Sequence, residues 1–263
     1  MTIVVSLTTI PSRLSLIQPV IDSILAQSVS PDIIELYIPR VYRRIELGVV
    51  NESDFPQRCK VMRCDVDYGP ATKIVPALEK YKDKQDVVLI YCDDDRLYER
   101  RWIERLLEGS KRHPGACIAE QGFKVSDREA GITNRPSYKP SILKKLKDIF
   151  FRRSQPTQVD VAEGYGGVLV RPSFFDSSVK TIPDVFWAVD DIWLSGKLAE
   201  AGVPIYKTKR RKRAKSRPLV ANQQVVGEEV DSLKHSTIEG HTRDQADLAC
   251  IEYFRQRVDS WRA

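Results

Sequence analysis

The segment Val87-Val-Leu-Ile-Tyr-Cys-Asp-Asp-Asp-Arg96 is the most informative part of the sequence. Its six apolar residues end abruptly in three consecutive acids, Asp93, Asp94 and Asp95. A short apolar run that stops at a polar break is typical of a buried strand, and open α/β sheets bind ligands at the carboxyl ends of such strands. Alternation along the strand lets Asp93 and Asp95 converge while Asp94 turns aside. A solvated acidic turn is the alternative interpretation.

The three acids also make a metal ion a natural partner of this segment. Neighbouring carboxylates repel one another, and burying them without partners is costly. A divalent cation relieves both problems, and Mg²⁺ and Mn²⁺ prefer hard oxygen ligands. We therefore expect the end of this strand to be a candidate site for such a cation.

The composition limits the class of protein. The chain has 263 residues, of which 42% are hydrophobic, enough for the core of one large α/β domain or two small ones. The formal net charge is +6, which favours anionic partners such as nucleotides, phospholipid surfaces or acidic glycans. Five scattered cysteines without a CxxC pair indicate a reducing compartment rather than a disulfide scaffold.

The order of apolar runs predicts the fold. We expect strands at residues 3–7, 33–38, 61–64, 87–92 and 116–119, and helices at 14–26 (capped by Ser12), 72–81 and from Trp102 onward. This alternation is typical of a parallel α/β sheet. The first predicted strand follows Met1 directly, so it does not resemble a signal peptide, and no apolar run reaches the length of a membrane span. Without an internal repeat or long linker, residues 1–263 are expected to form one domain.

Two features of the second half carry possible chemistry. Residues 163–167 form a glycine-rich turn that fits neither GxGxxG nor a Walker A pattern. Asp190 and Asp191 open a predicted helix that ends at Gly202. Favourable interaction of these acids with the helix dipole is an alternative explanation for the pair. A last helix is expected near residues 244–258.

Two segments are strongly basic. Residues 207–217 contain eight Lys or Arg and account for the positive net charge. This segment could be an active-site loop that contacts diphosphate, a membrane-surface patch, a nucleic-acid patch or a solvated loop. Residues 142–153 have apolar and basic residues at helical spacing, which suits an anionic membrane surface or an ordinary helix packed on its own domain.

Together these features resemble the nucleotide-sugar glycosyltransferases of the GT-A fold, in particular the family 2-like bacterial enzymes. The resemblance covers most of residues 1–202. It consists of the segment Val4-Val-Ser-Leu-Thr-Thr9, a DxD-like acid run at Asp93 to Asp95, the glycine-containing segment 163–167 and an ED-like pair at Asp190 and Asp191. It implies a GT-A (Rossmann-like) fold, a mostly parallel sheet flanked by helices. Residues 1–120 would bind the nucleotide-sugar and 121–263 the acceptor.

The resemblance also implies an activity and a place for it. The expected enzyme is a metal-dependent, inverting glycosyltransferase that moves one sugar from a nucleoside-diphosphate sugar to a hydroxyl of a glycan or lipid-linked acceptor. Mn²⁺ or Mg²⁺ would be the cofactor. We expect a cytoplasmic location, with peripheral contact at the inner face of the plasma membrane through residues 142–153 and 207–217.

The resemblance assigns roles residue by residue. Asp93 and Asp95 would hold the metal, with His235 or His241 as a further ligand, and Asp191 would be the general base, with Asp190 orienting the acceptor or the base. Donor contacts would come from Thr8, Pro11, Arg13, Asp65 or Asp67, Lys73 and Asp94. Acceptor contacts would come from Gly164, Tyr165, Gly166, Gly167 and Trp187.

The chain departs from the family pattern in two ways. Its opening is Leu7-Thr-Thr-Ile-Pro-Ser-Arg13 rather than Pro-x-Tyr-Asn, and no Gln-x-x-Arg-Trp motif follows Asp191. The second absence favours transfer of single sugars over processive synthesis.

Two other functions stay open. One is a sugar-phosphate nucleotidyltransferase, although residues 8–13 lack the glycine of its usual loop. The other is a non-enzymatic binder of nucleic acid or membrane through residues 207–217, which leaves both acidic segments unexplained. Nucleic acid is not an expected partner.

Overall fold

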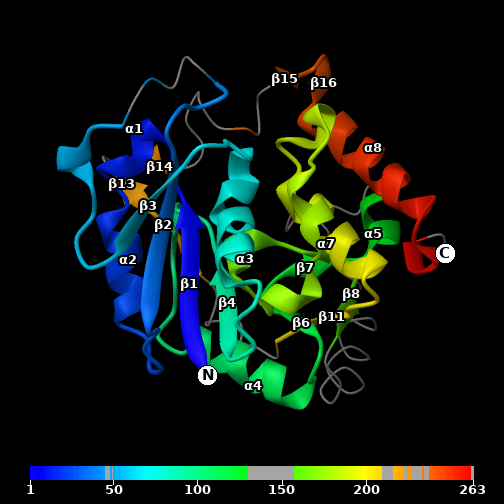
Figure 1. Ribbon diagram of the computed structural model, residues 1–263, viewed down its shortest axis with the longest axis horizontal. Coiled ribbons are helices and arrows are strands. Elements are labelled where there is room, and N and C mark those ends of the chain that lie inside the picture. The colour runs from blue at the N-terminus through cyan, green and yellow to red at the C-terminus, as the bar shows by residue number, and fades with distance from the viewer. Residues whose placement is uncertain are drawn as a thin grey trace, which may run out of the picture.

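The computed structural model describes residues 1–44, 48, 50–129, 157–208, 216–221, 224–226, 233 and 237–261. Within them, an eight-stranded sheet has the order β3-β2-β1-β4-β10-β6-β11-β8, with helices on both faces (Figure 1). The strands are β1 (Thr2–Thr8), β2 (Ile33–Pro39), β3 (Lys60–Cys64), β4 (Val87–Tyr91), β6 (Cys117–Ala119), β8 (Gln158–Val159), β10 (Val168–Val170) and β11 (Ile205–Lys207).

The helices and the small strand pairs surround this sheet. The α-helices are α1 (Pro11–Leu14), α2 (Gln18–Leu25), α3 (Val75–Tyr81), α4 (Trp102–Arg112), α5 (Val125–Glu129), α7 (Asp190–Glu200) and α8 (Arg243–Arg255). Four two-stranded pairs join β5 (Arg96–Leu97) to β12 (Arg217–Pro218), β7 (Gly122–Phe123) to β9 (Val161–Ala162), β13 (Val220–Ala221) to β14 (Gln224–Val225) and β15 (Thr237–Ile238) to β16 (His241–Thr242).

The predicted α/β class, with a mostly parallel sheet flanked by helices, is confirmed. Strands β3, β2, β1 and β4 are mutually parallel, and β6 runs parallel to β11. The sheet is nevertheless mixed, because β10 is antiparallel to both β4 and β6, and β8 is antiparallel to β11. One continuous sheet therefore runs through both predicted halves of the chain.

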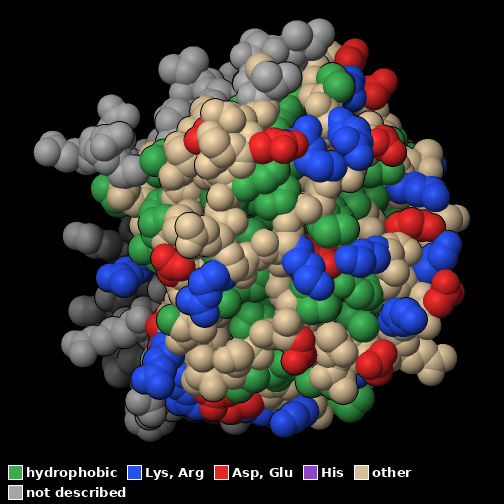
Figure 2. All heavy atoms as spheres, turned by 60° about the vertical axis from the view of Figure 1, so that its left-hand side comes forward, with side chains coloured by type: hydrophobic (Ala, Val, Ile, Leu, Met, Phe, Trp, Pro, Cys, Tyr) green, Lys and Arg blue, Asp and Glu red, His purple; other side chains and the backbone are tan. Residues whose placement is uncertain are grey.

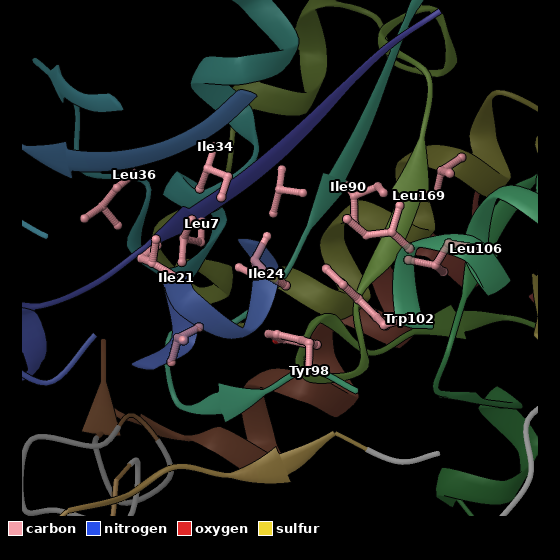
Figure 3. Packing of buried hydrophobic residues seen from close by; sticks show 14 of the residues in the cluster. Leu7, Ile21, Ile24, Ile34, Leu36, Ile90, Tyr98, Trp102, Leu106 and Leu169 are labelled. Atoms are coloured by element: carbon pink, nitrogen blue, oxygen red, sulfur yellow. The ribbon is translucent and has the colours of Figure 1, made fainter. Parts of the chain in front are cut away.

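The strands are apolar throughout because both faces of the sheet are covered. In β1, Ile3, Val5 and Leu7 face α2 and α4, whereas Val4 faces α3 and α7. Figure 3 shows the first of these layers, in which Leu7 and Ile90 from the strands meet side chains of α2 and α4. Helix α8 lies beyond α7, packed through aromatic residues such as Trp193 and Phe254 (Figure 1).

The prediction of one helix over residues 14–26 is wrong. The segment forms two helices, α1 and α2, and Ser12 lies inside α1 rather than capping residue 14. Pro19 occupies the first turn of α2. Proline cannot donate the backbone hydrogen bond that would continue a helix from the preceding turn, so the helix restarts there. The other expected helices exist with shifted ends, and 72–81 begins as a 3₁₀ turn, η3 (Gly69–Lys73), before α3.

The parallel strands carry the chain to one edge of the sheet. The loops after β1, β2, β3 and β4 all contribute residues to one cavity there. In the described part of the chain, no helix has both the length and the apolar character needed to cross a membrane.

Candidate functional site

A cavity of about 230 Å³ opens at the carboxyl ends of the four parallel strands. It also receives the start of α7 and the start of α8, which come from the second half of the chain. Residues that are far apart in the sequence therefore share one confined space, at the position where α/β sheets bind ligands.

The acidic turn after β4 is anchored to the loop after β1. Strand β4 ends at Tyr91, so the three acids lie in a turn rather than on the strand. The two carboxylate oxygens of Asp94 accept hydrogen bonds from the Thr9 hydroxyl and from Nη1 of Arg13, the latter at 3.2 Å. Asp94 is buried, and burial raises its pKa. These two hydrogen bonds hold the turn in place, so they use the Asp94 carboxylate within the protein.

Asp95 presents a carboxylate oxygen that lacks a partner within the described part of the chain. Its backbone carbonyl accepts a hydrogen bond from the Leu219 amide at 2.8 Å, which fixes the turn to the segment after β12. Its Oδ1 is buried and has no hydrogen-bond partner among the residues that the structure describes. Burial, followed by the Asp93 and Asp94 carboxylates, raises the pKa of Asp95 to about 7.

Lys73 joins the two acidic segments. Its Nζ lies 2.6 Å from Oδ1 of Asp93 and 2.7 Å from Oδ2 of Asp190, and the residue is only 3% exposed. Burial alone would lower the pKa of Lys73, but the carboxylates of Asp190 and Asp93 outweigh it and raise the pKa well above its usual value. Lys73 is therefore a buried, charged ammonium between the segments.

The first two residues of α7 complete the site. Oδ1 of Asp190 is 3.9 Å from Nη2 of Arg243, at the start of α8. Oδ1 of Asp191 accepts a hydrogen bond of 2.9 Å from the Gly164 amide. Burial, followed by the charge of Asp190, raises the pKa of Asp191 well above its usual value. A carboxylate held by one oxygen and with a raised pKa is suited to accept a proton.

The charge balance of the cavity fits a bound cation. Six of its described lining residues are Asp and four are Arg or Lys, which leaves two negative charges in excess when all are ionised. Asp95 supplies a buried oxygen for which the described residues offer no partner. However, no three His, Cys, Asp or Glu side chains within the described ranges converge as a complete metal-binding group. The residues therefore fit a cation that takes its remaining ligands from a substrate or water.

Most predicted site residues meet at this cavity, and some do not. The lining contains Thr8, Arg13, Asp67, Lys73, Asp93, Asp94, Asp95, Trp187, Asp190 and Asp191. Pro11, Asp65, the turn from Gly164 to Gly167 and His241 are not among its described lining residues. His235 lies outside the described residues, as do residues 142–153 and 209–215 of the basic segments.

The structure distinguishes between the two candidates for a base contact. Asp65 is exposed and pairs with Arg40 at the surface. Asp67 lines the cavity, and its two oxygens accept hydrogen bonds from the backbone amides of Arg43 and Gly69. Only Asp67 is therefore placed to meet a ligand in this cavity.

The glycine-rich turn packs against the site without lining it. A side chain on Gly167, which has a φ of +90°, would meet the Trp102 ring, and the Gly166 carbonyl accepts a hydrogen bond from Trp102. Tyr165 stacks on Arg96. These residues are thus explained by packing, and only Gly164 contacts a proposed catalytic group.

Trp187 lines the cavity, whereas His241 is not among its described lining residues. Trp187 donates a hydrogen bond to the Asp67 carbonyl, and its ring covers Gly69, which has a φ of +60°. It therefore forms the wall beside Asp67. His241 is exposed on β16, with Nδ1 2.8 Å from the Glu239 carbonyl oxygen.

Sequence reasoning missed several lining residues, including Arg243, Tyr42 and Arg44. Arg243 had a usable signal, because Thr242 and Gln245 form a capping box that marks the start of α8. Tyr42, whose hydroxyl donates to the Thr9 carbonyl, belongs to a loop without any motif.

Basic and acidic side chains are mixed on one face of the molecule (Figure 2). Figure 2 shows Lys and Arg side chains interspersed with Asp and Glu over one face, rather than gathered into one area. The chain matches no protein-family model and no curated protein.

Proposed function

We propose that this protein is a metal-dependent glycosyltransferase of the GT-A type that moves one sugar from a nucleoside-diphosphate sugar to an acceptor hydroxyl, with inversion. One observation carries the proposal. A single cavity at the carboxyl ends of parallel strands joins the Asp93–Asp95 turn to the Asp190–Asp191 pair, which follows 95 residues after Asp95. Carboxylates at an anion-binding site repel the anion unless a cation accompanies it.

The acid turn would hold the metal. Asp95, through the oxygen that has no partner among the described residues, and Asp93, which also contacts Lys73, are the residues for Mn²⁺ or Mg²⁺. When bound, such a cation would neutralise the charge that develops on the leaving diphosphate. Asp67 and Trp187 would contact the nucleoside, and Arg13 would keep Asp94 and the turn in position.

Asp191 would act as the general base. The Gly164 amide fixes Oδ1, and the raised pKa makes the carboxylate a better proton acceptor. It would take the proton of the acceptor hydroxyl as that oxygen attacks the anomeric carbon. Direct displacement of this kind inverts the anomeric centre. A glycan or a lipid-linked sugar is the proposed acceptor, reached in the cytoplasm or at the inner membrane face.

The proposal is tested by donor hydrolysis and transfer across a panel of UDP-, GDP-, dTDP- and CMP-sugars with Mn²⁺, Mg²⁺ or EDTA. We expect release of one nucleotide that depends on the metal and falls about a hundredfold in Asp95→Asn. Asp65→Asn is the matched control, because that acid lies outside the cavity.

Two results would contradict the proposal. Silence across the panel together with no nucleotide binding by calorimetry would reject a nucleotide-sugar enzyme. Release of pyrophosphate from a nucleoside triphosphate and a sugar phosphate would instead indicate nucleotidyl transfer.

A further inference from the structure

The contacts of Lys73 differ from those expected of a residue that binds the nucleotide-sugar donor. Four groups surround its ammonium: Asp93 at 2.6 Å, Asp190 at 2.7 Å, the Tyr91 ring with its centroid at 5.8 Å, and the backbone at Gly164. The Ser6 hydroxyl donates a hydrogen bond to the Lys73 carbonyl and so ties the backbone to β1. The side chain is 4% exposed, so its charge is already used inside the protein.

Lys73 and Asp191 pack closely around Gly164. A Cβ atom at residue 164 would lie 2.5 Å from Nζ of Lys73 and 3.1 Å from Oδ1 of Asp191. The same residue donates its amide to that Asp191 oxygen. A side chain at 164 would therefore lie against both the ammonium and the proposed base, so the two groups flank the same glycine.

We propose, resting on the function above, that Lys73 is a positioning residue that couples the metal side of the cavity to the base side. Its ammonium contacts Asp93 as a resident positive charge and competes there with a divalent cation. Repulsion between the two positive charges favours a cation-bound state in which the ammonium keeps Asp190 and gives up Asp93. Occupancy of the metal side thus changes the surroundings of the Asp190–Asp191 pair.

The test is direct binding of Mn²⁺, followed by electron paramagnetic resonance in the absence of nucleotide. Removing the competing ammonium in Lys73→Met is expected to tighten Mn²⁺ binding about tenfold, while kcat for transfer falls and the Kd for nucleoside diphosphate changes little. A purely structural role would leave Mn²⁺ binding unchanged or weaken it. Lys197→Met is the matched control, because Lys197 is a largely buried lysine on α7 that pairs with Glu200 outside the cavity.

A second pair of variants keeps the test decisive if Lys73→Met does not fold. The double variant Lys73→Met/Asp190→Asn removes one charge of each sign, and it is compared with Asp190→Asn alone. Tighter Mn²⁺ binding in the double variant supports the coupling, and equal or weaker binding overturns it. If wild type binds no Mn²⁺ with or without nucleotide, the metal-dependent function fails and the inference fails with it.

Discussion

The two acidic segments of the cavity look alike in sequence and differ in how their charges are compensated. At the start of α7, Asp190 lies against Lys73 and Arg243, and Asp191 accepts the Gly164 amide. In the turn after β4, Asp94 is compensated by Thr9 and Arg13, but Asp95 keeps a buried oxygen without a partner within the described chain.

The difference separates two kinds of chemistry. An acid pair whose partners come from the protein keeps a fixed geometry, which suits proton transfer. A turn whose charge is only partly compensated has a place for a cation from outside, which suits metal binding. Each prediction below would either remove this distinction or make it sharper.

The largest effect is expected at the α7 pair. Asp191→Asn removes the proton acceptor but keeps an oxygen for the Gly164 amide, so transfer should fall about a thousandfold with donor and metal binding intact. Rapid-quench transfer assays and calorimetry with the nucleoside diphosphate measure the two quantities. Loss of binding with preserved chemistry would mean that the base lies elsewhere.

The second effect is expected in the turn. Asp95→Asn removes the charge from the oxygen without a partner, so metal-dependent donor turnover should fall about a hundredfold and Mn²⁺ affinity should fall with it. Electron paramagnetic resonance reports the affinity, and circular dichroism checks that the variant folds. A folded variant with normal turnover and Mn²⁺ affinity would erase the distinction between the segments.

The third effect concerns stability rather than rate. Asp94→Asn removes the carboxylate that pairs with the partly buried guanidinium of Arg13. We therefore expect the free energy of unfolding to fall by about 2 kcal/mol. Thermal unfolding measures it. Asp184→Asn is the control, since Asp184 pairs with Arg43 at the surface, where such pairs contribute about 0–1 kcal/mol. Equal losses in both variants would show that Asp94 does not anchor the turn.

The fold was more predictable than the site, for physical reasons. Apolar runs such as 87–92 identify buried strands because burial of both sheet faces requires continuous hydrophobicity. The site depends on where loops meet, which periodicity does not encode. Asp65 and Asp67 are equivalent in sequence, yet only Asp67 turns inward. The glycines at 166 and 167 suggested a ligand, but they make room for Gln121 and Trp102.

The smallest expected effect is a pH dependence of stability, and its sign follows from Asp95. The pKa of this carboxyl is about 7 in the folded protein against its usual 3.8. Between these values the folded state keeps a proton that the unfolded state releases, so this group's stabilisation is complete below pH 4 and is lost as the pH rises through 7.

The melting temperature of metal-free wild type should therefore fall with rising pH by about 3 °C more than that of Asp95→Asn, which cannot lose this proton. Added Mn²⁺ should restore the wild type at pH 8, because the cation then replaces the proton at the same oxygen, and should leave Asp95→Asn unchanged. Parallel pH profiles of the two proteins would mean that Asp95 is compensated in solution as fully as Asp190. The difference between the turn after β4 and the start of α7 would then no longer assign the metal to either segment.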